Sequence, residues 1–192
     1  MDTKPNPFLL NIPGELSSQR LSLRTPRAGD GAVVFPSVRD SLAELKLWMP
    51  WATDDYDERG AEEWCRKAAG EFLLRKQVQY LIFSKSHGRH LGNIGAFDFK
   101  WEIPSCEIGY WLRTSHVGSG YMTEAVGVLA TMLIHTLKAH RVQIRTDETN
   151  HRSRRVAELA GFQLEGILRQ DSLATGGGLR NTCVFSRITD EV

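Results

Sequence analysis

The fold of this chain is decided by residues 115–125, which read SHVGSGYMTEA and join two different hydrophobic patterns. Before them, apolar residues alternate with polar or small ones over residues 107–112, which predicts a strand with two chemically different faces. After them, apolar residues recur three and four positions apart over residues 125–137, which predicts a mostly buried helix. The chain must therefore turn sharply at Gly118 and Gly120.

A turn of this kind gathers backbone N–H groups at the start of the helix. Because Gly118 and Gly120 have no side chains, the N–H groups up to Tyr121 can point at one place. The positive end of the helix dipole adds to their attraction for an anion. The pattern favours a diphosphate-binding loop, although an ordinary strand-to-helix turn would use the same glycines. No P-loop Lys-Ser/Thr and no GxGxxG is present, so a kinase or dinucleotide enzyme is not expected.

At these residues the sequence resembles the GNAT superfamily of acetyl-CoA-dependent N-acyltransferases, whose R/Q-x-x-G-x-G/A motif lies between a strand and a helix. Gly118 and Gly120 match that motif, and Ser115 stands in place of the Arg or Gln. The wider pattern resembles the RimJ/RimL branch, which acetylates N-terminal amines of ribosomal proteins. The phrases that carry this resemblance are EIGYWL at 107–112, GYMTEA at 120–125, NHRS at 150–153, AGF at 160–162, EG at 165–166 and LR at 168–169. The resemblance extends from about Arg20 to Ile188.

The order of the expected elements indicates an α+β fold. The strands are expected at 20–24, 79–84, 91–101, 107–112, 141–147, 162–173 and 181–188, and the helices at 37–45, 58–77, 125–137 and 150–160. This order fits a mixed, mostly antiparallel sheet flanked by helices on both faces, and it resembles the GNAT fold. With 192 residues and 41% hydrophobic content, we expect a single domain over 1–192, of which 1–19 form an N-terminal extension.

Composition limits the possible partners and the compartment. A net charge of +1 gives no general attraction for nucleic acid or for an anionic membrane. Cys65, Cys106 and Cys183 are odd in number and far apart, which favours buried thiols in the cytoplasm over a disulfide framework. We expect no export signal, no membrane span and no metal site, because no apolar run is long enough and no ligand cluster has metal spacing.

The resemblance implies that acetyl-CoA is the cosubstrate. It implies that the pantetheine arm lies along the end of strand 107–112, beside the backbone N–H groups of that strand. An ordinary strand with both edges paired is the alternative. The cofactor-binding residues that we expect are Trp111, Leu112, Arg113, Gly118, Ser119, Gly120, Tyr121, Met122, Asn150 and Ser153. Asn150 is also a good helix N-cap by itself, and Ser153 is also an ordinary first-turn residue.

Two residues are candidates for proton transfer. Glu107 lies early in its strand, on the face opposite Ile108, and is our candidate general base; a carboxylate paired with an Arg is the alternative. Many GNAT members have a Tyr seven residues after the helix Asn, and this sequence has Ala157 there. The resemblance implies that Ser153 lies near the cofactor sulfur, so Ser153 is our candidate acid.

The acceptor is expected to be an amine. Trp48 and Trp51 belong to WMPW at 48–51, which resembles an element beside the acceptor entrance of RimL-like enzymes; core packing is the alternative. About a tenth of an α-amine is neutral at pH 7, against roughly one in 2,500 for Lys, so a weak base suffices for protein N-termini. The alternatives are a small amine such as a polyamine, amino acid or antibiotic, or a non-catalytic CoA-binding module. The family also makes a homodimer plausible.

Overall fold

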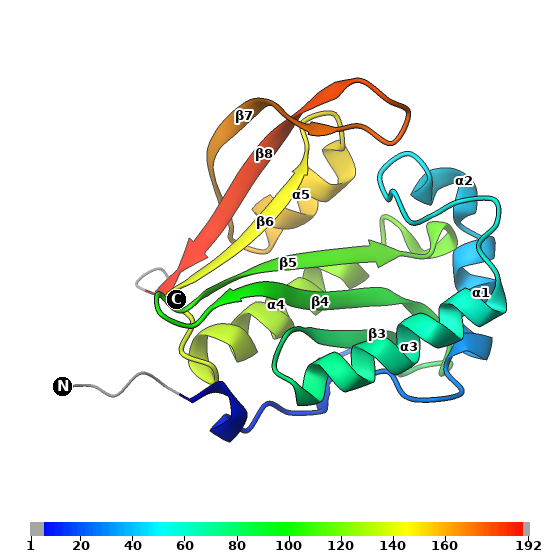
Figure 1. The fold of residues 1–192 in the computed structure, drawn as a ribbon, viewed down its shortest axis with the longest axis horizontal. Coiled ribbons are helices and arrows are strands. Elements are labelled where there is room, and N and C mark those ends of the chain that lie inside the picture. The colour runs from blue at the N-terminus through cyan, green and yellow to red at the C-terminus, as the bar shows by residue number, and fades with distance from the viewer. Residues whose placement is uncertain (1–5, 190–192) are drawn as a thin grey trace.

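The computed structural model describes residues 6–189 and contains one mixed sheet of eight strands in this range (Figure 1). The strands lie in the order β1-β2-β3-β4-β5-β6-β8-β7, and every neighbouring pair is antiparallel except β5 and β6. Helix α3 covers one face, and α4 and α5 cover the other. The predicted mixed, mostly antiparallel sheet with helices on both faces is confirmed.

The strands are Glu15–Ser17 (β1), Leu21–Arg24 (β2), Val78–Ser84 (β3), His90–Lys100 (β4), Ser105–Leu112 (β5), Arg141–Asp147 (β6), Gln163–Leu173 (β7) and Leu179–Ile188 (β8). The helices are Gly31–Arg39 (α1), Leu42–Leu45 (α2), Glu58–Leu73 (α3), Tyr121–His135 (α4) and His151–Leu159 (α5), with short 3-10 turns at Pro7–Leu9 and Thr114–His116. Most boundaries lie within a few residues of those that the alternation and spacing of apolar residues predict.

Part of the segment expected as an N-terminal extension belongs to the sheet. Residues Glu15–Ser17 form β1, which pairs with β2 from Glu15 opposite Arg24 to Ser17 opposite Ser22. Ile12 is buried in the main core. A strand of three residues with one half-buried side chain carries too little alternation to be recognised, which is why the sequence pattern does not reveal it.

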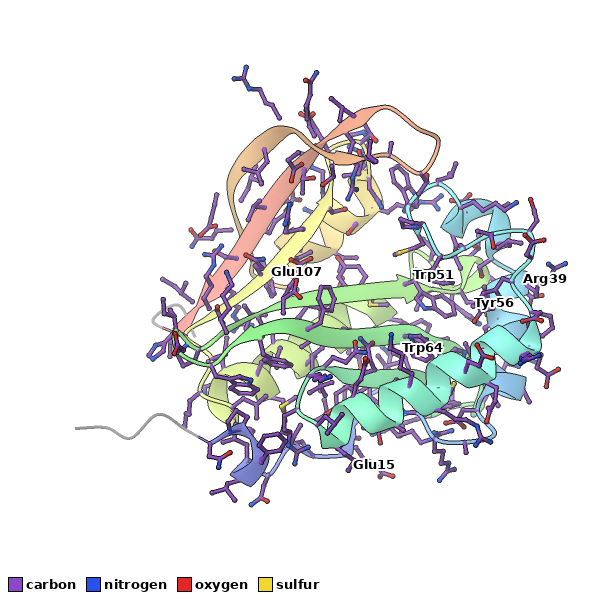
Figure 2. The ribbon with its side chains drawn as sticks, in the orientation of Figure 1. Glu15, Arg39, Trp51, Tyr56, Trp64 and Glu107 are labelled. Carbon is purple, nitrogen blue, oxygen red and sulfur yellow. The ribbon has the colours of Figure 1, made fainter. Side chains whose placement is uncertain are left out.

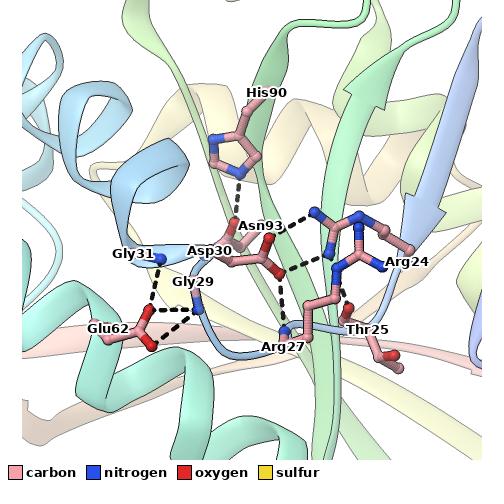
Figure 3. A network of polar contacts seen from close by, with 9 residues as sticks. All are labelled: Arg24, Thr25, Arg27, Gly29, Asp30, Gly31, Glu62, His90 and Asn93. Carbon is pink, nitrogen blue, oxygen red and sulfur yellow. Dashed lines mark hydrogen bonds and ion pairs between the residues drawn. The ribbon is translucent and has the colours of Figure 1, made fainter.

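The helix predicted over 37–45 is instead two helices, and the first of them begins at Gly31. Pro36 lies inside α1, where a proline costs roughly 3 kcal/mol because it removes a hydrogen bond. Burial of Val34 and Val38 against α3 offsets this cost. Glu62 of α3 adds to the anchoring, because its carboxylate accepts hydrogen bonds from the N–H groups at the start of α1 (Figure 3).

The sheet separates two hydrophobic clusters. The larger cluster lies between the sheet and α4 and includes Ile94, Ile108 and Leu129; the smaller lies under α1 and α3 and includes Leu81 and Trp111. Ile108 and Trp111 belong to the same strand, so the two faces of β5 contribute to different clusters. The alternation over 107–112 therefore corresponds to two buried faces, which is the arrangement expected for a central strand. The three cysteines are buried and free.

Strands β5 and β6 pair only at their beginnings. Their register runs from Ser105 opposite Arg141 to Glu107 opposite Gln143, and β6 then continues as a partner of β8 alone. Figure 1 shows the two strands diverging from this point. One edge of β5 is therefore left without a strand partner beyond Glu107, and the candidate site lies there.

Candidate active site

A cavity of about 1200 Å³ lies along β5 where β6 diverges from it. Its walls come from the α2–α3 loop, from the start of α4, from α5 and from both faces of β5. Binding sites for drug-sized molecules usually have about 300–1,000 Å³. The cavity is therefore large enough for an extended cofactor arm and a second reactant together.

The lining includes most residues that the sequence pattern and the resemblance single out. These are Trp48, Trp51, Glu107, Trp111, Leu112, Gly118, Gly120, Tyr121, Met122, Asn150 and Ser153. Arg113 and Ser119 are outside the lining. The guanidinium of Arg113 forms an ion pair with Asp40, and the carbonyl of Ser119 accepts a hydrogen bond from Arg20.

The loop before α4 has the geometry of an anion site. Gly118 and Gly120 have φ values of +85° and +76°, which favour glycine because a Cβ is strained there. Within residues 6–189, the N–H groups from Gly118 to Thr123 have no hydrogen-bond acceptor. Unpaired N–H groups at the positive end of a 15-residue helix fit a diphosphate.

Arg20 stabilises this loop from the neighbouring strand segment. Its Nη1 donates to the carbonyl of Ser119 at 2.9 Å, and its Nε lies 2.6 Å from Oε2 of Glu124 in the first turn of α4. Its guanidinium also lies over the ring of Tyr121, 4.6 Å from the centroid. Sequence reasoning missed Arg20, because nothing in the pattern shows that residues 99 positions apart meet.

The free edge of β5 presents particular N–H groups. The N–H of Arg113 donates to the carbonyl of Leu91 on β4 at 2.7 Å. Because successive residues of a strand point their N–H groups to opposite edges, the N–H of Trp111 also faces β4. The N–H groups of Tyr110 and Leu112 then face the gap. Trp111 instead contributes its indole to the cavity wall.

Glu107 lies at the point where β5 and β6 separate. Its Oε2 accepts a hydrogen bond of 3.0 Å from Nε2 of Gln143, the residue opposite it on β6. Burial raises the pKa of Glu107 above its usual value, and the Gln143 hydrogen bond and the positive charge of Arg145 oppose the rise. No ion pair involves Glu107 among the described residues, so the alternative of a carboxylate paired with an Arg is not observed.

Ser153 faces the cavity from α5 on the other side of β5. Its Oγ lies 3.0 Å from the hydroxyl of Tyr110, and burial raises the pKa of Tyr110 to about 12, so this phenol is neutral. The side chain of Asn150 is the N-cap of α5, with Oδ1 accepting from the N–H of Ser153 at 3.0 Å. Tyr110 escaped the sequence analysis as a polar participant, because strand alternation identifies it only as an apolar-face residue.

The other end of the cavity is aromatic. The ring of Trp51 lies 5.8 Å from that of Tyr56 and 6.2 Å from that of Trp111, measured between centroids. Trp48 and Trp64 also line the cavity. Figure 2 shows Glu107 between β5 and β6, and Trp51 with Tyr56 toward the other end of β5. The side chains that line this wall thus offer apolar area and π faces to a bound molecule.

Residues 6–189 hold neither a cluster of metal ligands nor a membrane-spanning helix. No group of three or more His, Cys, Asp or Glu side chains there is placed to hold a metal ion. No helix in this part of the chain combines the length and the apolar character that crossing a bilayer requires.

Comparisons with known proteins place the chain in a family. Residues 20–163 match the acetyltransferase (GNAT) domain family. The ribosomal-protein-serine acetyltransferase of Escherichia coli (strain K12) is 38% identical over 67% of this chain and 73% of its own length. The probable N-acetyltransferase YjcK of Bacillus subtilis (strain 168) is 35% identical over 58% of this chain, which spans just under two thirds, 64%, of that relative.

A solved structure supports the fold. The structure of RimL, a ribosomal L7/L12 α-N-protein acetyltransferase in complex with coenzyme A, has a TM-score of 0.81 at 24% identity and covers 94% of this chain and 99% of its own. The family match covers most of the chain, and the named relatives agree with the RimJ/RimL resemblance. The chain therefore belongs to the GNAT family of N-acetyltransferases, and its similarity to a ribosomal-protein-serine acetyltransferase agrees with the RimJ/RimL branch.

Proposed function

We propose that this protein transfers an acetyl group from acetyl-CoA directly to the N-terminal α-amine of a protein. One observation carries the proposal: Glu107 and Ser153 border the same cavity from opposite faces of β5, where that strand loses its partner. A base and an acid on opposite sides of one strand suit a reaction in which an amine loses a proton and a thiolate gains one.

The residues of the cavity fit the donor. The free N–H groups at the start of α4 suit the diphosphate, and those of Tyr110 and Leu112 suit the amide carbonyls of the pantetheine arm and the carbonyl of the acetyl group. The amide nitrogen of Asn150 is available as a further donor, because its Oδ1 caps α5. When bound, acetyl-CoA supplies an acetyl thioester activated for attack by an amine.

On the acceptor side, Glu107 accepts the proton that the amine loses as the C–N bond forms. Burial raises its pKa, which makes it a stronger base than an exposed glutamate. On the other side of β5, the hydroxyl of Ser153 gives a proton to the sulfur as the C–S bond breaks, and its Oγ regains a proton from solvent. Tyr110 holds that hydroxyl in place at 3.0 Å.

A protein N-terminus suits this site better than a lysine side chain. An α-amine has a pKa of about 7.7–8.0 and is partly neutral at pH 7, so one carboxylate suffices as base. The name of the Escherichia coli relative, which acts on a ribosomal protein, supports a protein acceptor.

An acceptor panel with thiol-release detection tests the proposal. We expect turnover of peptides with a free N-terminus, little with Nα-blocked peptides that contain Lys, and little with polyamines. Glu107→Gln should lower kcat by roughly 10²–10⁴, as loss of a general base does. Glu63→Gln, on the exposed side of α3, is the matched control and should leave kcat unchanged.

Two outcomes would contradict the proposal. Rapid turnover of small amines without turnover of peptides would show a small-molecule acetyltransferase. Tight acetyl-CoA binding with no CoA release to any acceptor, unaltered by Glu107→Gln, would show a non-catalytic binding module.

A further inference from the structure

A row of buried, hydrogen-bonded side chains leads from α1 to the cavity. The proposed reaction uses none of them. His90 is only 3% exposed, and its two ring nitrogens are both hydrogen-bonded. Nδ1 lies 2.9 Å from Oγ of Ser37 on α1, and Nε2 lies 2.8 Å from Oδ1 of Asn93 on β4. Figure 3 shows His90 directed at the Asn93 amide. We call these three residues the His90 relay.

The relay fixes which way the Asn93 amide points. Burial, together with the charge of Arg113, lowers the pKa of His90 to about 4, so the ring is neutral at pH 7. The amide oxygen of Asn93 can only accept, so Nε2 carries the proton and Nδ1 is an acceptor. The Ser37 hydroxyl lies 2.9 Å from Nδ1 and 3.3 Å from the carbonyl of Val33, and it donates to the nearer Nδ1. The rings of Phe83 and Trp111 hold the imidazole at centroid distances of 5.5 and 5.8 Å.

The other end of the amide has no partner in the part of the chain that the structure describes. Asn93 is 5% exposed and lines the cavity, and its Nδ2 donates to no described residue. Nδ2 is not among the fully enclosed side-chain atoms that lack a partner, so it is open to the cavity and to whatever binds there. A nearly buried donor, held in orientation by a second buried group and bordering a cavity, is the arrangement expected of a contact to a bound molecule.

The sheet register places Asn93 at a definite distance from the candidate base. Asn93 lies opposite Trp111, and Phe97 lies opposite Glu107, so four residues along the sheet separate the two sites. That corresponds to roughly 13 Å at the spacing of a strand. An extended peptide covers roughly 3.3–3.6 Å per residue, so a peptide with its amine at Glu107 reaches Asn93 at its third or fourth residue.

We propose that Nδ2 of Asn93 donates a hydrogen bond to a backbone carbonyl oxygen of the acceptor peptide, and that His90 and Ser37 are positioning residues for that amide. The inference rests on the proposed function, since it requires a peptide acceptor. It makes the enzyme selective for acceptors of three or more residues. A single amino acid cannot span the distance, and a polyamine has no carbonyl oxygen to offer.

The test compares acceptors of two lengths in variants of Asn93. Asn93→Asp keeps an oxygen for His90 and removes the donor, and Asn93→Ala removes both. For a tetrapeptide amide we expect both variants to raise the acceptor KM roughly tenfold, the effect of leaving one hydrogen bond unmade, with kcat within twofold. For a single amino-acid amide, and for acetyl-CoA, we expect KM to stay within twofold.

Substitution of the positioning residues should act in the same direction. His90→Phe keeps an aromatic ring and removes both hydrogen bonds, so it should raise the tetrapeptide KM severalfold without changing kcat. Ser37→Ala should have a smaller effect of the same kind. Ser84→Ala is the matched control, because Ser84 is a buried serine whose hydroxyl contacts Ser86 in the β3–β4 turn, and its KM should equal that of the wild type.

The outcomes separate this inference from the proposed function. If the wild type acetylates tetrapeptides and both Asn93 variants keep its KM, the inference is overturned and the proposed function stands. The same holds if KM rises equally for single amino-acid amides, which would show a structural role only. If the wild type acetylates no peptide, the proposed function fails and this inference fails with it.

Discussion

At the scale of single residues, the environment of Glu107 decides how the rate depends on pH. Burial favours its neutral form, while the side-chain amide of Gln143 stabilises its carboxylate through a hydrogen bond of 3.0 Å. The first effect is larger, so the pKa of Glu107 lies above the usual value. A general base must be ionised, and its activity is therefore lost as the pH falls through this raised pKa.

We predict that kcat at saturating substrates falls on the acidic side with an apparent pKa above the ordinary glutamate value of about 4.3. Gln143→Leu should move this limb to higher pH, because the carboxylate loses a donor. Profiles of kcat against pH for the two proteins measure the difference. An unchanged limb in Gln143→Leu would mean that Glu107 is not the titrating base.

At the scale of elements, the start of α4 depends on backbone conformation more than on side chains. Gly120 has a φ of +76°, and a Cβ there would lie 3.4 Å from Nη2 of Arg20, the side chain that stabilises the loop. Gly88, in the turn before β4, has a φ of +66° and open space around it. The two glycines thus share backbone strain but differ in what surrounds them.

We predict that Gly120→Ala and Gly88→Ala each lower the free energy of unfolding by about 1 kcal/mol, the cost of a left-handed non-glycine residue. Only Gly120→Ala should also weaken CoA binding, by roughly tenfold or about 1.4 kcal/mol. Urea unfolding and titration calorimetry measure the two quantities separately. Equal CoA affinity in both variants would place the diphosphate elsewhere.

The helices and strands also show where prediction from the spacing of apolar residues succeeds and where it fails. Spacing of apolar residues located α4 and β6 well, because each has a buried face with a regular period. It placed the first helix at 37–45 whereas α1 begins at Gly31, because α1 contains Pro36, a residue that helix interiors disfavour. Two sets of contacts hold this helix: Glu62 with Gly29 and Gly31, and Arg24 with Asp30. They join separate elements, so no stretch of neighbouring residues in the sequence reveals them.

At the scale of the whole molecule, the sheet consists of two parts with a weak join. Strands β1–β5 and strands β6–β8 share only the three register pairs between β5 and β6. Across the cavity, Arg152 of α5 pairs with Glu44 of α2 at 3.1 Å, and the Thr175 hydroxyl donates to the carbonyl of Leu47 at 2.9 Å. A ligand between the two parts adds contacts to both.

We predict that CoA at a hundred times its dissociation constant stabilises the protein by about 2.7 kcal/mol. For a chain of this length, that raises the Tm by roughly 5–10 °C. Thermal unfolding with and without CoA measures the shift, and adenosine alone is the control, since it lacks the diphosphate and the pantetheine arm. The absence of any shift with CoA would contradict CoA binding in the cavity.

The sequence by itself determined the class of fold, the order of most elements, the glycine turn before α4 and part of the cavity lining. These features depend on local periodicity and on glycine's freedom of φ, which neighbouring residues encode. Only the tertiary structure decided that β5 and β6 part after Glu107, that Arg20 reaches Ser119, that Tyr110 meets Ser153, and that His90 orients Asn93. Each of these joins residues from separate elements, and their distances are set by the packing of the sheet and its helices rather than by any stretch of chain.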